Sequence, residues 1–248
     1  MVARLVWDQN VAGSSPVIPI KKIGYKLKDS LEKMVSWIPS LLDGAKLTIF
    51  LTLSSVSAGL VIAVFLALGK ISKNKILNKI CSFYIFFFRG TPLLLQLYFI
   101  WYELPKICGF FTLSNRFFAA FLTFSLNSSA YLAEVVRAAI VSIDKGQFEA
   151  SRSLGLNYFQ TMFTVIIPQA IARLLPPVSN EFILVLKDAS LVSLIALKDI
   201  TKITQNIASS SSSSLVYIPA AVIYLVITAF FSRSFRTLEN KFSKKSYL

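Results

Sequence analysis

The sequence has no histidine among its 248 residues, few charged residues, at 15%, and two cysteines. Without histidine, the chain offers no imidazole to bind a metal ion or to act as a general acid or base. Cys81 and Cys108 do not have the spacing of a metal-binding motif. They fall near opposite ends of one expected membrane span, so we expect no disulfide between them and interpret both as packing residues.

The sequence also lacks the motifs of a nucleotide-hydrolysing enzyme. It contains no P-loop of the form G-x-x-x-x-G-K-[ST] and no recognisable arrangement of a nucleophile with a base. We therefore predict that the chain is not an enzyme and has no catalytic residue, cofactor or metal site. If it moves a solute uphill, the energy must come from a partner.

What the chain has in abundance is apolar surface. Hydrophobic residues make up 55% of it and phenylalanine alone occurs 21 times, which is typical of an all-α membrane protein. The net charge of +14 raises the question of nucleic acid binding. The basic residues lie mostly between the apolar segments and no aromatic RNA-binding signature accompanies them, so we expect membrane lipid headgroups and not nucleic acid as the counter-charge.

Five apolar segments predict five transmembrane helices, because about 20 apolar residues cross a bilayer. The first, third, fourth and fifth cover about residues 47–68, 117–140, 177–197 and 215–231. The second lies within the apolar stretch 80–104, which Arg89 interrupts. The run of six serines at 209–214 predicts a flexible loop.

Arg89 predicts a break in that second segment, because an unpaired charge at the bilayer centre costs several kcal/mol. Thr91 can cap a helix and Pro92 suits the first helical position, so we expect the span to begin at Pro92. Residues 76–88 would then form an interfacial helix. We expect Arg89 to contact headgroups or a loop and not the substrate.

The basic residues also predict an orientation. The loop at 70–79, the region around 137–173 and the C-terminal tail together hold thirteen Lys and Arg, against four in the opposite loops. The positive-inside rule therefore places the C-terminus in the cytoplasm. The N-terminal segment conflicts with this, since it holds seven Lys and Arg before residue 47. We interpret residues 1–33 as a variable N-terminal tail, with translation from Met34 as an alternative.

Residues 147–170 predict a helix, a turn and a second helix between two spans. Gly155 can end the first helix in the left-handed conformation. Asn157 can cap the second helix and Gln160 can complete a capping box. Pro168 is expected to stop or kink that second helix.

This segment resembles the E-A-A-x3-G-x9-I-x-L-P loop of membrane subunits of ATP-binding cassette (ABC) importers, in their polar amino acid permease branch. The resemblance covers roughly residues 35–245 and has three further motifs in order, RGTPLLLQLYFIWY from Arg89, SSAYLAEVVRAAIVSIDKGQFEA from Ser128 and NEFILVLKDASLVSLIAL from Asn180. Ser151, Val165 and Ile167 replace Ala, Ile and Leu of the family pattern, which changes side-chain volume only slightly.

The resemblance implies a type I importer permease with residues 34–248 as its transmembrane domain, in the bacterial inner (plasma) membrane. It further implies a cytoplasmic coupling loop that docks into an ABC ATPase subunit through Glu149, Ala150, Ser151, Gly155 and Pro168. The other implied partners are a periplasmic or extracytoplasmic amino acid-binding protein and a dimer mate, either the chain itself or a second permease subunit. A secondary transporter and a non-transporting membrane scaffold are the alternatives.

Charged and polar residues inside the expected spans are the candidates for function. Glu134 and Arg137 are three residues apart, so we expect a local ion pair. Glu181 and Asp188 are two helical turns apart and share a helix face, which we expect to line the substrate pathway. Asn127 is a weaker candidate for the same cavity. Glu181 resembles the pattern of permeases for basic amino acids.

Overall fold

The computed structural model describes residues 20–107 and 115–246, and these form helices joined by short connections, with no strand among them. The elements are, in order, α2 (Ile20–Ile71), α3 (Lys75–Gly90), α4 (Leu93–Tyr98), the π-helix η1 (Phe99–Glu103), α5 (Leu104–Ile107), α6 (Arg116–Val141), α7 (Lys145–Ser153), α8 (Tyr158–Thr161), the π-helix η2 (Met162–Ile166), α9 (Ile167–Asp188), the 3-10 helix η3 (Ala189–Ile195), α10 (Ile200–Ser211), the 3-10 helix η4 (Ser214–Val216) and α11 (Tyr217–Ser246).

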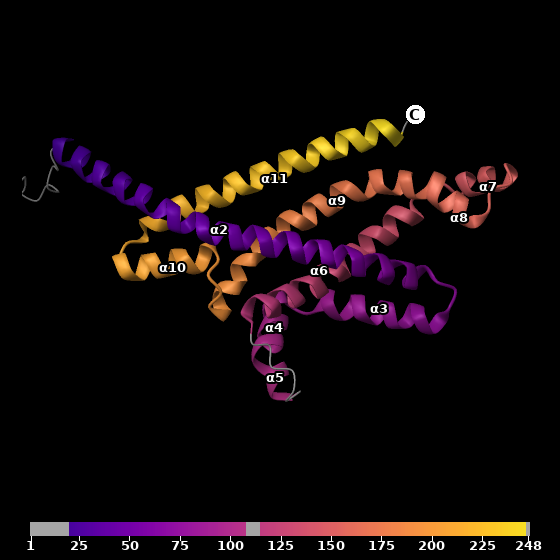
Figure 1. Cartoon of the computed structure of the whole chain (residues 1–248), viewed down its shortest axis with the longest axis horizontal. Helices are drawn as coiled ribbons and strands as arrows, with labels where there is room; N and C mark the ends of the chain where they lie inside the picture. Colours follow the sequence, from indigo (N-terminus) through magenta and orange to yellow (C-terminus); the bar gives the residue numbers. More distant parts are fainter. Residues whose placement is uncertain (1–19, 108–114, 247–248) are drawn as a thin grey trace, which may run out of the picture.

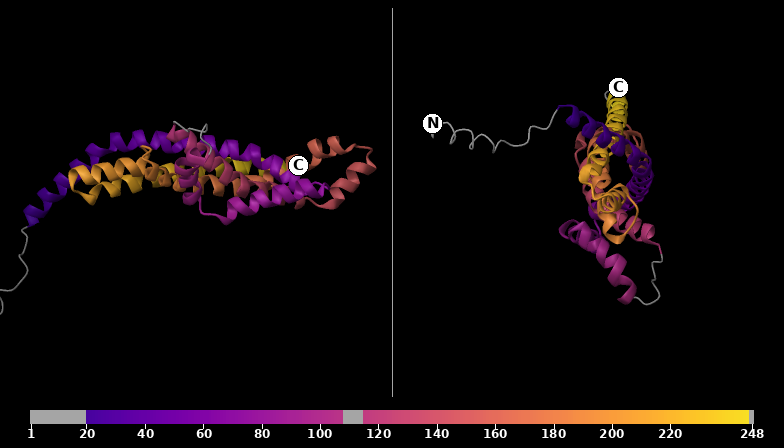
Figure 2. Two further views of the ribbon diagram at one scale, coloured as in Figure 1. Left: turned by 90° about the horizontal axis from the view of Figure 1, so that it is seen from below. Right: turned by 90° about the vertical axis from the view of Figure 1, so that its left-hand side faces the viewer.

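The molecule is an elongated bundle of four long helices, α2, α6, α9 and α11 (Figures 1 and 2). Helix α2 packs along α6, and α9 packs against both α6 and α11. Their shared core includes Leu51, Phe124, Leu132 and Phe182, all of them buried. The short helices α7 and α8 lie at one end of the bundle and α10 lies toward the other (Figure 1). The predicted all-helical fold is therefore confirmed.

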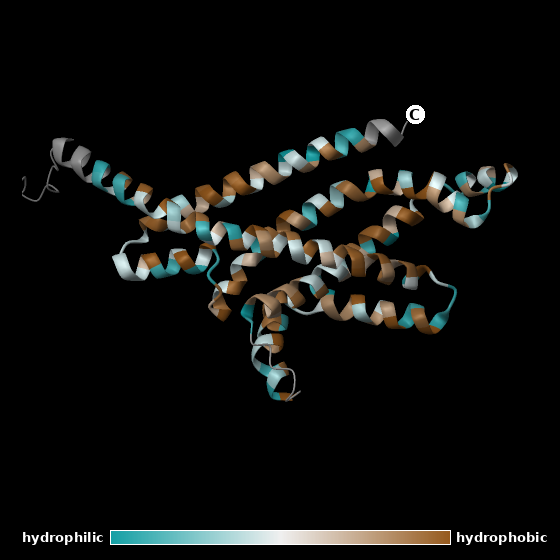
Figure 3. Cartoon of the chain, in the orientation of Figure 1, coloured by the Kyte–Doolittle hydropathy of each residue, from teal (hydrophilic) through white to brown (hydrophobic). Residues whose placement is uncertain are grey.

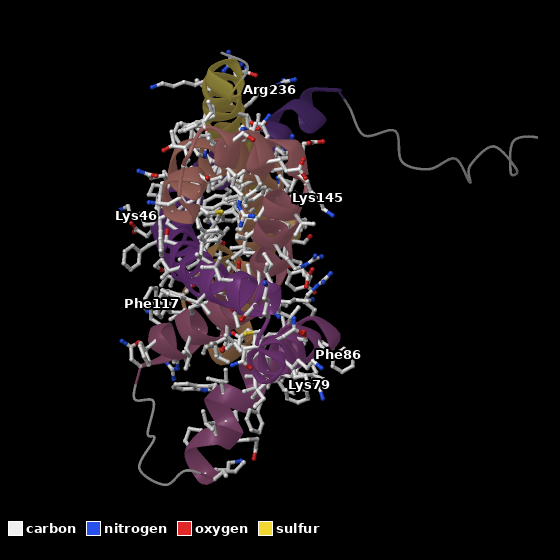
Figure 4. All side chains as sticks on the ribbon, turned by 90° about the vertical axis from the view of Figure 1, so that its right-hand side faces the viewer. Lys46, Lys79, Phe86, Phe117, Lys145 and Arg236 are labelled. Carbon is white, nitrogen blue, oxygen red and sulfur yellow. The ribbon has the colours of Figure 1, made fainter. Side chains whose placement is uncertain are left out.

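The outer surface of this bundle is apolar. Large hydrophobic side chains such as Phe65, Phe83 and Phe86 are exposed, and Figure 4 shows Phe86 on the outside of the bundle. Helix α11 changes from hydrophobic to hydrophilic toward its C-terminal end (Figure 3). An apolar exterior of this kind suits a lipid environment, because a soluble surface rarely exposes so much contiguous apolar area.

Two of the described helices, Lys28–Ile71 and Ser214–Phe242, are long and apolar enough to cross a membrane. A third candidate is the pair Lys75–Gly90 and Leu93–Ile107, which is bent by 101°. The predicted break at 89–92 is therefore confirmed. Its predicted cap is wrong, because Thr91 Oγ1 donates back to the carbonyl of Phe87, and Pro92, not Thr91, occupies the N-cap position of α4.

The helix that carries the predicted fourth span begins about ten residues before residue 177, and where that span enters the membrane stays a prediction. Helix α9 runs from Ile167 through Pro176 and Pro177 to Asp188, and Pro168 sits in its first turn. Pro168 does not stop the second loop helix, because α8, η2 and α9 follow one another without a break from Tyr158 to Asp188, with the π-helical turn Met162–Ile166 just before the proline. Packing of Val178 and Phe182 in the core holds α9 together across the two internal prolines.

The serine run is not a loop throughout, which corrects a second prediction. Ser209, Ser210 and Ser211 form the end of α10, and each hydroxyl donates to a carbonyl of the preceding turn. The helix begins at the Asp199 cap, whose carboxylate accepts from the N–H groups of Thr201 and Lys202. A capped and packed helix can therefore continue into serines that would not form a helix alone.

The described residues include one of the two cysteines. Cys81 is a free, buried thiol on α3, as a packing residue would be. Cys108 lies outside the described residues, so its predicted packing role stays a prediction. The boundary predicted at 33/34 is also untested, and α2 runs across it without a break.

Candidate functional site

A cavity of about 480 Å³ lies where the end of α3 and the start of α4 meet α6 and α9. Its wall combines apolar and charged side chains, namely Arg89, Gly90, Thr91, Pro92, Leu93, Phe124, Asn127, Tyr131, Glu181, Leu184, Val185 and Asp188. A volume of several hundred Å³ with a few polar groups on an apolar wall is typical of a small-molecule site.

The three residues predicted for the substrate pathway meet in this cavity. Glu181 and Asp188 come from α9, as expected for two residues that share a helix face, and Asn127 comes from the middle of α6. Glu181 and Asn127 are partly buried, whereas Asp188 is exposed on the single chain.

Arg89 also lines this cavity, whereas the sequence predicts that it contacts headgroups or a loop. Its guanidinium lies 5.2 Å from the centre of the Tyr131 ring on α6, a distance at which a cation interacts with the face of an aromatic ring. The sequence feature that could have predicted this position is the Gly-Thr-Pro break that directly follows Arg89. A break inside a span brings a charged residue to a cavity as readily as to the membrane surface.

The cavity therefore holds two carboxylates and one guanidinium. A free amino acid brings an ammonium and a carboxylate, and a basic amino acid brings a second cation. The arrangement can bind a small zwitterion by charge at both ends, and it offers one carboxylate more than a neutral amino acid needs.

The predicted helix-turn-helix at 147–170 forms the end of the bundle at α7 and α8 (Figure 1). Gly155 has a φ of +80°, and the N–H groups of Gly155 and Leu156 donate to the carbonyls of Arg152 and Ser151. This is the glycine-ended turn that the sequence predicts. The capping box is also present, with 2.9 Å between Asn157 N and Gln160 Oε1 and 2.9 Å between Gln160 N and Asn157 Oδ1.

The loop has a small core of its own. Ala139 on α6 and Ile143, two residues after the end of α6, pack with Ile166 on η2 and Ala170 on α9. Glutamine side chains add a contact between the flanking helices, since Gln169 Nε2 on α9 donates to Gln147 Oε1 on α7 at 3.2 Å. The element is thus a folded unit that continues both α6 and α9.

Of the residues named for this loop, Glu149, Ala150, Gly155 and Pro168 are exposed, and Ser151 is buried with its hydroxyl donating to the carbonyl of Gln147. The loop also carries an exposed apolar tip, which the sequence motifs did not predict. We call this set the loop tip, and it consists of Leu154, Tyr158, Phe159 and Phe163, which are between 63% and 81% exposed. Their only signal was an apolar content unusual for a loop between two spans.

Comparison with known proteins agrees with this geometry. Residues 59–244 match the family described as binding-protein-dependent transport system inner membrane component. The chain is 35% identical to the L-cystine transport system permease protein TcyL of Bacillus subtilis (strain 168), covering 84% of this chain and 89% of the relative. It is 37% identical to the putative glutamine transport system permease protein GlnP of Rickettsia bellii (strain RML369-C), covering 85% and 97%.

Among solved structures, the fold is similar to a crystal structure of an amino acid ABC transporter with histidines, with a TM-score of 0.77 and 39% identity. That match covers 84% of this chain and 97% of the other. ATP hydrolysis in such an importer belongs to a separate subunit, as the missing P-loop predicts. The chain therefore belongs to the binding-protein-dependent transport system inner membrane components, in their branch of polar amino acid ABC transporter permeases.

Proposed function

We propose that this permease carries cationic amino acids such as arginine and lysine. The observation that supports this is the charge of the cavity, where Glu181, Asp188 and Arg89 meet. A cationic amino acid carries two positive groups and one carboxylate, which is the complement of two carboxylates and one guanidinium. The relatives do not decide the substrate, because relatives named for different substrates are about equally similar to this chain. The one named for L-cystine is 35% identical and the one named for glutamine is 37% identical.

Each charged residue then has a separate role. Arg89 receives the substrate α-carboxylate, and its contact with Tyr131 holds the guanidinium at the cavity wall. Asp188 receives the α-ammonium group. Glu181 receives the cationic side chain and discriminates basic from neutral substrates. Asn127 has its amide nitrogen engaged by other residues, so its Oδ1 is the atom that can face a substrate donor.

Equilibrium binding to the purified permease–ATPase complex tests this proposal. We expect arginine and lysine to bind about tenfold more tightly than glutamine, which is the size of one charge contact at a partly desolvated site. Arg89→Gln should weaken all three ligands, because all three carry the carboxylate. Equal affinity for glutamine and arginine in the native complex would overturn the proposed substrate class.

We further propose that the loop tip docks on the ABC ATPase. Four large apolar side chains exposed beyond the spans are costly in water and suit a hydrophobic cleft on a partner. The loop tip is positioned by α7, which carries Glu149, Ala150 and Ser151, and by the start of α9, which carries Pro168. Gly155 forms the turn that follows α7.

The proposed topology has five spans, formed by α2, the bent unit α3 to α5, α6, α9 and α11. Helices α6 and α9 have 26 and 22 residues, enough to cross a bilayer at 1.5 Å per residue. The loop tip and the C-terminus then lie in the cytoplasm, and α10 lies on the side where an amino acid-binding protein would dock.

A second permease subunit, either another copy or a similar chain, completes the proposed assembly. Lys187 is exposed on the single chain and does not line the cavity that holds Asp188, although it lies on a helix of the proposed membrane region. Charged groups at bilayer depth face protein or a wet cavity and not lipid. A dimer mate over this face of α9 would provide that cover.

A further inference from the structure

The bend between α3 and α4 leaves a set of backbone carbonyl groups without helical partners. Helix α3 ends at Gly90 and α4 starts at Leu93, with an angle of 101° between the two halves of the segment. The last carbonyl groups of a helix have no partner within it. In a membrane there is no bulk water to replace those partners, so the protein must supply the donors.

Two side-chain amides supply these donors. Gln96 Nε2 lies 3.0 Å from the carbonyl oxygen of Phe88, 3.0 Å from that of Thr91 and 2.7 Å from Thr91 Oγ1. Asn127 Nδ2 on α6 donates to the same Phe88 carbonyl at 3.1 Å and to Gln96 Oε1 at 3.0 Å. Gln96 is only 6% exposed, so its bonds are shielded from water.

The network connects three elements at one point. It joins the last turn of α3, the first turn of α4 and the middle of α6. Phe88, which accepts from both amides, is the residue directly before Arg89. The direction in which the Arg89 side chain leaves the backbone therefore depends on where Gln96 and Asn127 hold that carbonyl.

We infer that Gln96 is a positioning residue, which together with Asn127 fixes the bend and so directs Arg89 into the cavity. Gln96 itself is absent from the cavity wall and acts on the substrate only through Arg89. This inference rests on the proposed role of Arg89 as the contact for the substrate carboxylate. It explains why a buried glutamine lies in an otherwise apolar helix, at the fourth position of α4.

The test compares arginine with agmatine, which is arginine without its carboxylate, in equilibrium binding to the purified permease–ATPase complex. In the native complex we expect agmatine to bind about tenfold more weakly, the size of one charge-assisted contact. Arg89→Gln should bring this ratio close to about one. Gln96→Leu should reduce the ratio to a similar extent, and adding Gln96→Leu to Arg89→Gln should change the ratio no further, because both changes act on one contact.

A purely structural role for Gln96 predicts a different result. Gln96→Leu would then weaken arginine and agmatine equally and leave their ratio unchanged, which would overturn the inference. Gln205→Leu is the matched control, since the Gln205 side chain on α10 makes no hydrogen bond with the described residues. Its ratio should equal that of the native complex.

A second variant covers the case in which Gln96→Leu does not fold. In Gln96→Glu, a neutral carboxyl group keeps one donor in place of two N–H donors, so the ratio should be intermediate. A native-like ratio in this variant would also count against the inference. If Arg89→Gln leaves the ratio at its native value, the proposed role of Arg89 fails instead, and the two failures are thus distinguishable.

Discussion

Lys70, in the last turn of α2, donates a hydrogen bond to Glu134 on α6, although the two residues are 64 positions apart. Glu134 also accepts from Arg137 Nε at 2.9 Å, which confirms the predicted local pair. The Glu134 side chain is 19% exposed and the Lys70 side chain 28%. One carboxylate thus links the end of α2 to the helix that leads into the helix-turn-helix at 147–170.

From this relationship we predict that Glu134→Gln lowers the melting temperature of the purified complex by about 3 °C, because two partly buried cations lose their common counter-ion. Asp43→Asn is the matched control. Asp43 pairs with Lys46 on an exposed helix surface, where ion pairs contribute little, so its melting temperature should stay native. Equal shifts in both variants would show that the Glu134 network contributes no more than a surface pair.

Gly155→Val should uncouple the permease from its ATPase. Gly155 has a φ of +80°, and a β-branched residue cannot take that conformation without strain, so the turn below the loop tip should open. The measurement is recovery of the ATPase with tagged permease in detergent. Gly155→Asn is the control, because asparagine tolerates a positive φ. Native recovery together with normal uptake in Gly155→Val would contradict docking through this loop.

Gly44→Ala should destabilise the contact between α2 and the start of α10. A Cβ at this position would lie 2.8 Å from the carbonyl carbon of Asp199 and 2.8 Å from the nitrogen of Ile200, both of them backbone atoms. The melting temperature should fall by about 4 °C or more, because backbone atoms cannot move away from the added methyl group as easily as the end of a flexible side chain could. In Gly90→Ala the added methyl group meets no atom within 4 Å, so that variant should melt like the native chain.

How far the sequence predicts this structure depends on the range of the interaction. The Gly155 turn and the Asn157 cap are local and were predicted correctly, because their hydrogen bonds join residues a few positions apart. The end of α10 in the serine run was missed, because the packing of Ile200, Ile203 and Ile207 holds the helix earlier in its length and the helix continues from there into exposed serines.

In the candidate site, the shared face of Glu181 and Asp188 follows from helical spacing alone. The cavity position of Arg89 does not, because it depends on a bend whose direction is set by Gln96 and Asn127. The hydrophobic periodicity of the sequence does not predict a contact between α4 and α6. The loop tip was missed for a different reason. The family motif consists mainly of small residues of the loop and does not include the exposed apolar side chains of the tip.

A chain that begins at Met34 should insert into the membrane and transport normally. Among the side chains that the structure describes, the ion pairs of residues 28–33 are Lys28 with Glu32 and Asp29 with Lys33, and both pairs are exposed. A chain that begins after Ala45 is the contrasting variant. It lacks Leu41 and Ala45, which are buried in the core with α10 and α11, so it should be degraded or inactive. Loss of insertion in the shorter truncation would show that the tail is required.

The last prediction concerns the residue that would select the substrate. Glu181 and Asp188 lie two turns apart on α9 and line one cavity with Arg89, so two like charges share a site of low dielectric with a single cation. A second cation from the substrate side chain would relieve their repulsion. Glu181→Gln keeps the size and hydrogen-bonding capacity of the side chain and removes its charge. It should therefore lower arginine and lysine uptake about tenfold and leave glutamine uptake nearly native.

Transport into vesicles that contain the ATPase and binding protein measures this difference. Asp188→Asn provides the contrast, because the α-ammonium group is common to all amino acids and uptake of arginine and glutamine should fall together. Glu103→Gln is the control for charge alone, since Glu103 forms its exposed ion pair with Lys106 outside the Glu181 cavity. If Glu181→Gln lowers arginine and glutamine uptake equally, Glu181 is a polar residue of the fold and the preference for cations must come from elsewhere.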